Sequence, residues 1–187
     1  LHHHETSTVS PMIFIHGLFG SLSNLGVLAR HFSEQRTAIQ IDVRNHGLSG
    51  HSSDINYQLM AEDVLETLSS LNVHKFVVVG HSMGGKIAMK LADLAREQTE
   101  KLVVLDITPI QYHENHHAEI FQALFAVQQA NVASRLEAAK IMHKYIHEEM
   151  VIQFLLKSFN KGQWLFNVQS LFDHYPDIMA WEKVEKI

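Results

Sequence analysis

The segment at residues 75–86, KFVVVGHSMGGK, constrains the fold more than any other part of this 187-residue sequence. Residues 76–79 form an apolar, mostly β-branched run, which is typical of a strand buried on both faces of a parallel sheet. The run stops at Gly80, and a helical pattern of apolar residues follows. A strand, a G-x-S-x-G turn and a helix make up a nucleophile elbow, in which a sharp turn presents the central serine. The sequence therefore predicts an exposed hydroxyl at Ser82.

Two glycines allow a turn this sharp. Gly80 and Gly84 lack the side chains that would collide across the turn, and the residue at its centre is forced into a strained backbone conformation. Met83 then begins the following helix, so its backbone N–H is directed at the group that Ser82 attacks. Met83 is therefore one predicted donor of an oxyanion hole.

A second glycine-bearing loop follows the first predicted strand. Residues 12–15 are apolar, and the sequence HGLFGS occupies residues 16–21. A loop in this place supplies the other oxyanion donor to a nucleophile elbow, and we assign that donor to the N–H of Leu18. His16, in the same loop, is interpreted as a hydrogen-bonded structural residue.

Apolar strand patterns alternate with helical patterns over the first 110 residues. The predicted strands cover residues 12–15, 37–41, 76–79 and 102–105, with a predicted helix between each consecutive pair. This order predicts an α/β fold with a doubly wound parallel sheet and right-handed crossovers. The chemistry of such sheets lies beyond the carboxyl ends of the strands. Four polar residues fall there: His16, Asp42, Ser82 and Asp106.

Four motifs carry a resemblance to a known family. They are HGLFGS at 16–21, DVRNHGLS at 42–49, GHSMGGK at 80–86 and LDITP at 105–109. In their order and spacing the sequence resembles the α/β-hydrolase superfamily, in particular the YbfF-like bacterial esterases and their mitochondrial relatives. The resemblance implies a serine esterase or thioesterase that acts on short-chain carboxylic esters, or on acyl-CoA thioesters, through an acyl-enzyme. It also implies that no metal or organic cofactor takes part.

Asp106 is the expected acid of a Ser-Asp-His triad. The resemblance implies an acid at the end of the strand that follows the elbow helix, and Asp106 occupies that position. A parallel strand next to the elbow strand also delivers its last residue to the same sheet edge. The alternative is an aspartate that caps the turn before Pro109. Asp42 and Asp63 are weaker candidates, and we expect Asp42 and Arg44 to brace their loop by charge-assisted hydrogen bonds.

Beyond residue 110 the pattern changes to helices alone. Predicted helices cover residues 116–129, 132–146 and 148–159, and Gly162 marks the end of the third, with shorter helical pieces after it. We expect residues 1–110 to form the hydrolase core and residues 111–187 to form a helical cap inserted between strands of the sheet. An apolar cap over a polar sheet edge favours a substrate with an apolar acyl group.

The catalytic histidine is not expected within this chain. In this fold the triad order is serine, acid, histidine, and every histidine after Asp106 lies in the helical region. His81 adjoins Ser82, but neighbouring side chains at an elbow diverge. The resemblance implies a return to the sheet after residue 187, so we expect the C-terminal strand–helix units to be absent and this chain by itself to be inactive and poorly folded. The last strand present should then be an exposed sheet edge.

Two other functions stay open on the sequence. A hydrolase scaffold also serves ligand-binding proteins that have no turnover. Residues 80–86 match the start of a phosphate-binding loop, Gly-x-x-x-x-Gly-Lys, but Ile87 stands where serine or threonine would coordinate magnesium. A P-loop nucleotidase is therefore the least favoured of the three functions.

The amino-acid composition limits the classes of partner that we expect for this protein. The formal net charge is −5, and no basic stripe favours nucleic acid or an anionic membrane. The sequence has no cysteine, which fits a reducing, cytoplasmic compartment, and no apolar stretch long enough to span a bilayer. His143 and His147 are four residues apart, but no carboxylate or cysteine completes a recognisable metal site. A small-molecule ester or thioester is the expected partner, and the oligomeric state is left open.

Overall fold

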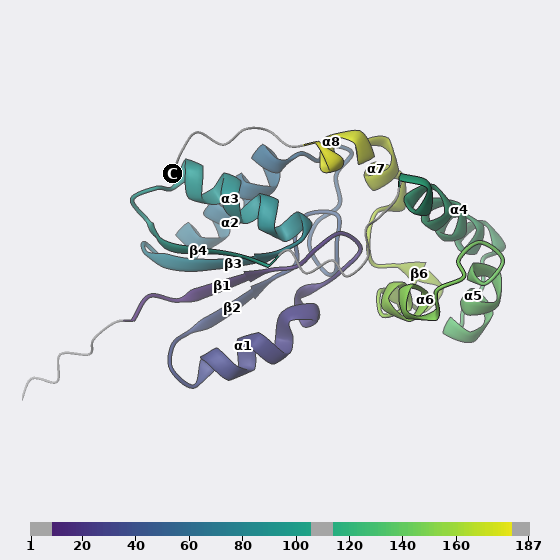
Figure 1. Cartoon of the computed structure of the whole chain (residues 1–187), viewed down its shortest axis with the longest axis horizontal. Helices are drawn as coiled ribbons and strands as arrows, with labels where there is room; N and C mark the ends of the chain where they lie inside the picture. Colours follow the sequence, from purple (N-terminus) through teal and green to yellow (C-terminus); the bar gives the residue numbers. More distant parts are fainter. Residues whose placement is uncertain (1–8, 106–113, 181–187) are drawn as a thin grey trace, which may run out of the picture.

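A four-stranded parallel sheet forms the centre of the computed structural model, which describes residues 9–105 and 114–180. Its strands are β1 (Met12–Ile15), β2 (Ala38–Ile41), β3 (Phe76–His81) and β4 (Thr99–Leu105). They lie side by side in the order β2-β1-β3-β4 (Figure 1). Each neighbouring pair runs parallel. The predicted doubly wound parallel sheet is therefore confirmed.

Helices cover the two faces of the sheet. The short 3-10 helix η1 (Leu22–Leu25) and helix α1 (Gly26–Ser33) lie on one face, and α2 (Tyr57–Ser70) and α3 (Met83–Leu94) lie on the other (Figure 1). Successive side chains of a strand point to opposite faces. Ile13 and Ile15 accordingly join the cluster on the α2–α3 face, whereas Met12 and Phe14 pack with Ala29 of α1. This explains why β1 reads as a continuous apolar run.

Strand β4 differs from the other strands in its burial. In the described part of the chain it pairs with β3 alone, so it lies at the edge of the sheet. Its valines are partly open to solvent, with Val103 38% and Val104 40% exposed. The expectation that the last strand forms an exposed edge is confirmed for these residues.

The segment that follows residue 113 is built mainly of helices, as the sequence predicts. The longest is α4 (Glu114–Ala130), followed by α5 (Arg135–Met142) and α6 (Glu149–Leu156). Two short helices, α7 (Val168–Asp173) and α8 (Tyr175–Met179), come later. In Figure 1 these helices lie beyond one end of the sheet. The expected boundary at residues 110/111 falls outside the described residues.

The prediction of helices alone beyond residue 110 is wrong at one place. Helix α6 ends at Leu156, and a small antiparallel hairpin of β5 (Phe159–Asn160) and β6 (Gln163–Trp164) follows. The turn residues Lys161 and Gly162 have φ of 49° and 81°. A two-residue hairpin turn with both φ values positive suits the twist of its strands. Gly162 therefore closes a hairpin, whereas the sequence indicated the end of a helix.

Phe19 joins the loop after β1 to the helical segment. Its ring lies edge-on to Phe121 of α4, with ring centroids 5.5 Å apart, and its centroid is 5.1 Å from that of Phe166. The Ser158 hydroxyl donates to the Phe19 carbonyl at 3.2 Å. A second connection runs from the amide of Asn167 to the carbonyl of Asn45 at 2.8 Å. Two loops at the carboxyl edge of the sheet thus bind the helical segment that follows residue 113.

Two buried histidines hold those same loops together. Nε2 of His16 accepts from the amide of Val43 at 3.1 Å, and Nε2 of His46 accepts from the amide of Phe19 at 3.1 Å. Each Nδ1 lies against a backbone carbonyl, that of Gly17 for His16 and that of Arg44 for His46, so Nδ1 must carry the proton. The two rings meet edge-on with centroids 5.2 Å apart. We call His16 and His46 the histidine pair.

The histidine pair is stable only in its neutral form. His16 is 1% exposed and His46 is fully buried. Burial lowers the pKa of His16, and burial together with the neighbouring His16 lowers the pKa of His46 to about 3. A proton added to Nε2 would meet a backbone N–H, and the hydrogen bond between the loops would be lost. The prediction that His16 is a hydrogen-bonded structural residue is confirmed.

The lowered pKa values predict an acid-sensitive fold. The contribution of His46 is fully present above its unfolded pKa of 6.5 and is lost as the pH falls towards about 3. We expect the free energy of unfolding to fall below pH 6.5, by up to about 1.4 kcal/mol per pH unit for each such histidine. His46→Leu should lower stability by about 1–3 kcal/mol at pH 7.5, because it leaves buried backbone groups unpaired.

Urea unfolding at pH 7.5, 6.5, 5.5 and 4.5 measures both effects. His46→Leu should flatten the pH dependence, whereas His31→Leu, which alters an exposed position on α1, should leave it unchanged. Equal slopes for the wild-type protein and His46→Leu would contradict the account of the histidine pair.

Candidate active site

Ser82 lies at a sharp turn between β3 and α3. Its φ of 54° and ψ of −120° place a non-glycine residue in a strained region of backbone space. The amide of Ser82 donates to the carbonyl of Leu105 at 3.0 Å, and its carbonyl accepts from the amide of Gly85 at 2.8 Å. These bonds to β4 and to the start of α3 hold the strained residue in place.

The glycines on either side of Ser82 are required by close backbone approach. A Cβ at Gly80 would overlap the carbonyl oxygen of Gly84, and a Cβ at Gly84 would overlap the carbonyl oxygen of Ile15 in β1. The second contact brings the start of α3 directly against the end of β1. The predicted strand–turn–helix elbow is therefore present, and its glycines have the predicted role.

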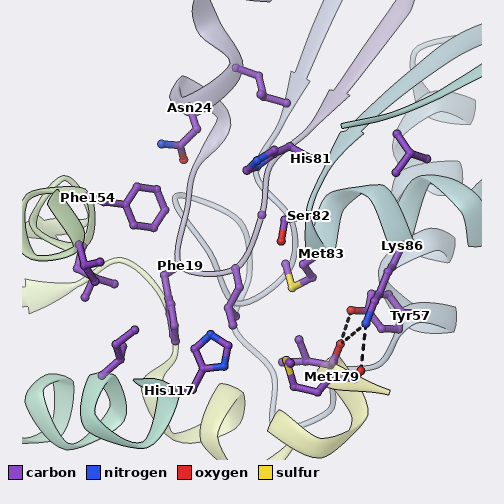
Figure 2. Close-up of a pocket in the computed structure, with 18 of the residues that line it drawn as sticks. Phe19, Asn24, Tyr57, His81, Ser82, Met83, Lys86, His117, Phe154 and Met179 are labelled. Carbon is purple, nitrogen blue, oxygen red and sulfur yellow. Dashed lines mark hydrogen bonds between the residues drawn. The ribbon is translucent and has the colours of Figure 1, made fainter. Parts of the chain in front are cut away.

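The loop after β1 lies against this elbow. A Cβ placed on Gly17 would be 3.4 Å from Cβ of Ser82 and 3.2 Å from the carbonyl oxygen of His81. Leu18 follows Gly17, and it lines the same cavity as Ser82 and Met83 (Figure 2). Within residues 9–105 and 114–180, the amides of Leu18 and Met83 donate to no backbone acceptor. The structure thus brings the two predicted oxyanion donors to the cavity that contains Ser82.

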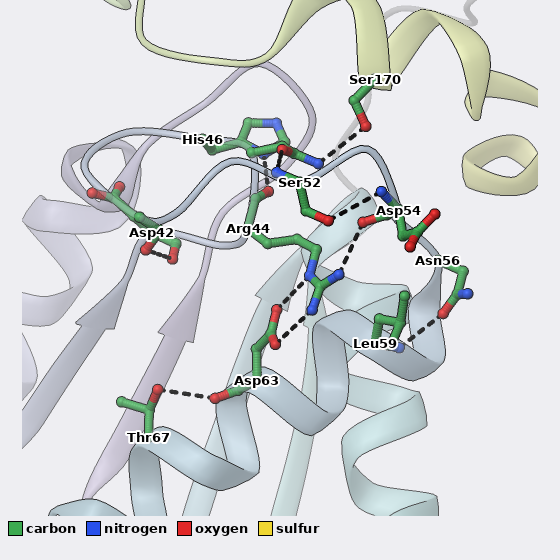
Figure 3. A network of polar contacts seen from close by, with 12 residues as sticks. Asp42, Arg44, His46, Ser52, Asp54, Asn56, Leu59, Asp63, Thr67 and Ser170 are labelled. Carbon is green, nitrogen blue, oxygen red and sulfur yellow. Dashed lines mark hydrogen bonds and ion pairs between the residues drawn. The ribbon is translucent and has the colours of Figure 1, made fainter.

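Asp42 and Arg44 brace the neighbouring loop, as the sequence predicts. The Asp42 carboxylate accepts from the amides of Leu22 at 2.7 Å and Leu48 at 3.0 Å. Arg44 makes a two-pronged ion pair with Asp63 of α2, with N–O distances of 2.7 and 2.9 Å (Figure 3). Both carboxylates are therefore used to hold loops, which supports the ranking of Asp42 and Asp63 below Asp106.

The loop at residues 42–50 also contacts the helical segment. The side-chain amide of Asn45 donates to the hydroxyl of Ser170 at 3.2 Å (Figure 3). That hydroxyl donates to the carbonyl of Ser53 at 3.2 Å. Asn45 and Ser170 are both buried. These bonds link α7 to the same edge of the sheet as Ser82.

A cavity of about 710 Å³ opens in front of Ser82. The sheet edge and the elbow form its floor, and helices α4, α6 and α8 contribute side chains to its walls (Figure 2). Most of these side chains are apolar or aromatic. The cavity is lined by Gly17, Leu18, Phe19, Asn24, Leu25, Tyr57, His81, Ser82, Met83, Lys86, Met89, Val104, His117, Ile120, Val151, Phe154, Leu155, Ile178 and Met179.

Asp106, the expected acid, lies outside the described residues. Strand β4 ends one residue earlier at Leu105, whose carbonyl accepts from the Ser82 amide. Two histidines line the cavity with Ser82, namely His81 and His117. Figure 2 shows the His81 ring and the Ser82 hydroxyl leaving the chain in different directions, as expected for neighbours at an elbow.

Four polar residues of the cavity were not predicted from the sequence: Asn24, Tyr57, Lys86 and His117. Lys86 lies in the first turn of α3, four residues after Ser82, so its position on the Ser82 side of the helix follows from helical spacing. His117 of α4 has no such signal, because it reaches the cavity only through the packing of distant segments.

The helical segment also bears on the question of a metal site. Nε2 of His143 lies 3.3 Å from Oε2 of Glu149, and both side chains are exposed. Within the described residues, no three His, Cys, Asp or Glu side chains form a metal-ligand cluster.

Comparison with known proteins is consistent with this geometry. A family described as "alpha/beta hydrolase fold" matches residues 10–151. The chain is 50% identical to the Escherichia coli esterase YbfF over 94% of its own length and 69% of that protein. It is 37% identical to the sn-1-specific diacylglycerol lipase ABHD11 of Danio rerio, over 94% of its own length and 59% of that protein. This chain therefore spans roughly 60–70% of the length of these relatives.

A solved structure agrees with the sequence relatives. A marine microorganism esterase superimposes with a TM-score of 0.84 at 33% identity, covering 93% of this chain and 70% of that one. None of the helices in the described ranges is both long and apolar enough to cross a membrane. The family match, the identity to YbfF and the elbow geometry together show that this chain belongs to the α/β-hydrolase fold family.

Proposed function

We propose that the protein is a serine hydrolase of carboxylic esters and that Ser82 is its nucleophile. One observation carries this proposal: a strained serine sits at the floor of an apolar cavity, beside two backbone amides without backbone acceptors in the described chain. A phosphate-binding loop fits less well, because Lys86 donates to backbone carbonyls of α8. The esterases and the lipase among the relatives support the same reaction class.

The geometry suits acyl transfer in two steps. The Ser82 hydroxyl loses its proton to a general base and attacks the ester carbonyl carbon. The carbonyl oxygen becomes negatively charged, and the N–H groups of Leu18 and Met83 donate to it. The alcohol leaves with the proton from the base, and an acyl-enzyme remains. Water then attacks the acyl-enzyme and releases the acid.

We assign the orienting acid to Asp106 and the general base to a histidine outside the described residues. Asp106 follows Leu105 in sequence, whose carbonyl accepts from the Ser82 amide, and in a parallel sheet the carboxyl ends of the strands meet at one edge. His81 points away from the Ser82 hydroxyl (Figure 2). His117 packs edge-on against Tyr175 of α8, with ring centroids 5.1 Å apart. We therefore assign both pocket histidines to the wall of the cavity.

The cavity favours an apolar acyl group. Val151, Phe154 and Leu155 of α6 and Ile120 of α4 supply apolar wall, and the volume of about 710 Å³ lies within the range of small-molecule sites. Burial of acyl methylenes against these side chains would contribute about 0.8 kcal/mol each. We include acyl thioesters among the proposed substrates, because they present the same carbonyl to the same donors.

Removal of the nucleophile is the first test of this function. Ser82→Ala should lower kcat/KM for p-nitrophenyl butyrate by about a thousandfold or more in the protein expressed at its natural length. Circular dichroism and thermal unfolding should match the wild-type protein, because one oxygen atom is removed. Turnover within tenfold of the wild-type rate would show that another residue attacks the ester. A wild-type protein that binds the ester without cleaving it would favour a ligand-binding function.

Asp106→Asn tests the assigned acid. The change should lower kcat by about 10⁴-fold, as in the serine-protease triad, because the amide stabilises the wrong tautomer of the base. Asp93→Asn is the matched control, since Asp93 pairs with Arg96 on the surface of α3, and its turnover should equal that of wild type. Equal rates for both variants would remove Asp106 from the triad.

His81→Gln and His117→Gln test the assigned base. Each variant should keep kcat within about tenfold of the wild-type value, because a residue that only shapes the cavity changes binding more than chemistry. Steady-state kinetics with p-nitrophenyl butyrate gives kcat and KM separately. Loss of kcat by a thousandfold in either variant, with the fold intact, would identify that histidine as the base and refute our assignment.

A further inference from the structure

Lys86 binds the C-terminal end of helix α8. Its Nζ donates to the carbonyl oxygens of Ile178 at 3.3 Å, Met179 at 3.1 Å and Ala180 at 3.2 Å. Figure 2 shows these bonds crossing from the elbow helix to α8. Lys86 and Ala180 are 94 residues apart in sequence, so the contact joins the elbow to the far end of the helical segment.

The contact has a clear electrostatic cause. The last carbonyls of a helix have no partner within the helix and carry its negative dipole end, which favours a cation. The Tyr57 hydroxyl, from the first residue of α2, adds a bond of 2.5 Å to the Ile178 carbonyl. Nζ of Lys86 also lies 5.6 Å from the centroid of the Tyr57 ring. Burial raises the pKa of Tyr57, so its hydroxyl remains a neutral donor.

These bonds hold a wall of the substrate cavity. Ile178 and Met179 line the cavity, as do Tyr57 and Lys86 themselves. Ile178 is 3% exposed and packs into the core, whereas Met179 is 45% exposed. Bonds from two residues of the hydrolase core to the backbone at the end of α8 thus add to the packing of Ile178 and Tyr175 in holding this helix at the cavity.

We propose that Lys86 and Tyr57 form a latch that fixes α8 as a wall of the acyl pocket, and that this latch limits the length of the acyl chain that the pocket accepts. The proposal rests on the proposed ester hydrolase function and adds to it a pair of specificity-determining residues. Lys86 is placed for this role because it lies one helical turn after Ser82, on the side of α3 that faces the cavity.

The latch consists of hydrogen bonds to backbone carbonyls, so these bonds do not depend on which side chains α8 carries. Without Lys86, the carbonyls of Ile178, Met179 and Ala180 lose their cation. The Tyr57 hydroxyl still donates to the Ile178 carbonyl. The end of the helix is then free to move outward, and the cavity lengthens on this side. Longer acyl chains gain room, while the surroundings of the Ser82 hydroxyl are unchanged.

Lys86→Met and the matched control Lys90→Met test the proposal in the protein at its natural length. Lys90 lies on the same helix and does not line the cavity. The ratio of kcat/KM for p-nitrophenyl decanoate over p-nitrophenyl butyrate should rise by about tenfold in Lys86→Met, mainly through KM for the decanoate. The ratio should stay unchanged in Lys90→Met. A purely structural role for Lys86 would lower both rates together and leave the ratio unchanged, which would overturn the proposal.

Hydrogen–deuterium exchange tests the latch without any turnover. The amides of Ile178 and Ala180 donate to His174 and Pro176 within α8, so they should exchange faster in Lys86→Met and at the wild-type rate in Lys90→Met. Unchanged exchange in Lys86→Met would refute the latch, whatever the kinetics show.

Binding separates failure of the latch from failure of the proposed function. If the wild-type protein cleaves neither ester, ester hydrolysis is refuted. The latch is then tested by calorimetry, which measures the affinities for methyl decanoate and methyl butyrate. In a Ser82→Ala background, Lys86→Met should then raise the affinity for the decanoate alone. Equal changes for both esters would overturn the acyl-length proposal.

Discussion

The reciprocal hydrogen bonds of His16 and His46 are the interaction on which the site depends. The loop that carries Leu18 and the loop at residues 42–50 have no strand pairing of their own, and each takes an imidazole acceptor from the other. The same loops hold the helical segment through Phe19 and Asn45. Because both imidazoles are buried and neutral, they hold the loop that carries Leu18 against the loop at residues 42–50.

The parts of the fold that depend on local sequence were predictable. The β-branched run before Gly80 and the helical spacing after Met83 define the elbow within a dozen residues, and the structure has both elements there. The presence of four strands and their parallel direction follow from the alternation of strand and helix patterns. The positions of Ser82, Met83 and Leu18 at the cavity were predictable for the same reason, since each occupies a fixed place in a local motif, whereas their catalytic roles stay predictions.

The features that depend on distant contacts were not predictable. The hairpin of β5 and β6 is formed by strands of two residues each, too short for a periodic pattern, so Gly162 resembled a helix end. His46 stands in a loop motif, but its bond to the amide of Phe19 spans 27 residues. Lys86 resembled the lysine of a phosphate loop, and only the folded chain shows its bonds to the carbonyls of α8.

In the proposed mechanism, Ser82 attacks an acyl carbon, and the amides of Leu18 and Met83 donate hydrogen bonds to the oxygen on that carbon. The most direct measurement is a crystal structure of the protein after reaction with an alkyl fluorophosphonate, with intact mass to count the adducts. We expect one adduct on Oγ of Ser82, with the phosphoryl oxygen about 2.7–3.1 Å from both amide nitrogens. An adduct on another residue, or a phosphoryl oxygen directed away from these two amides, would contradict it.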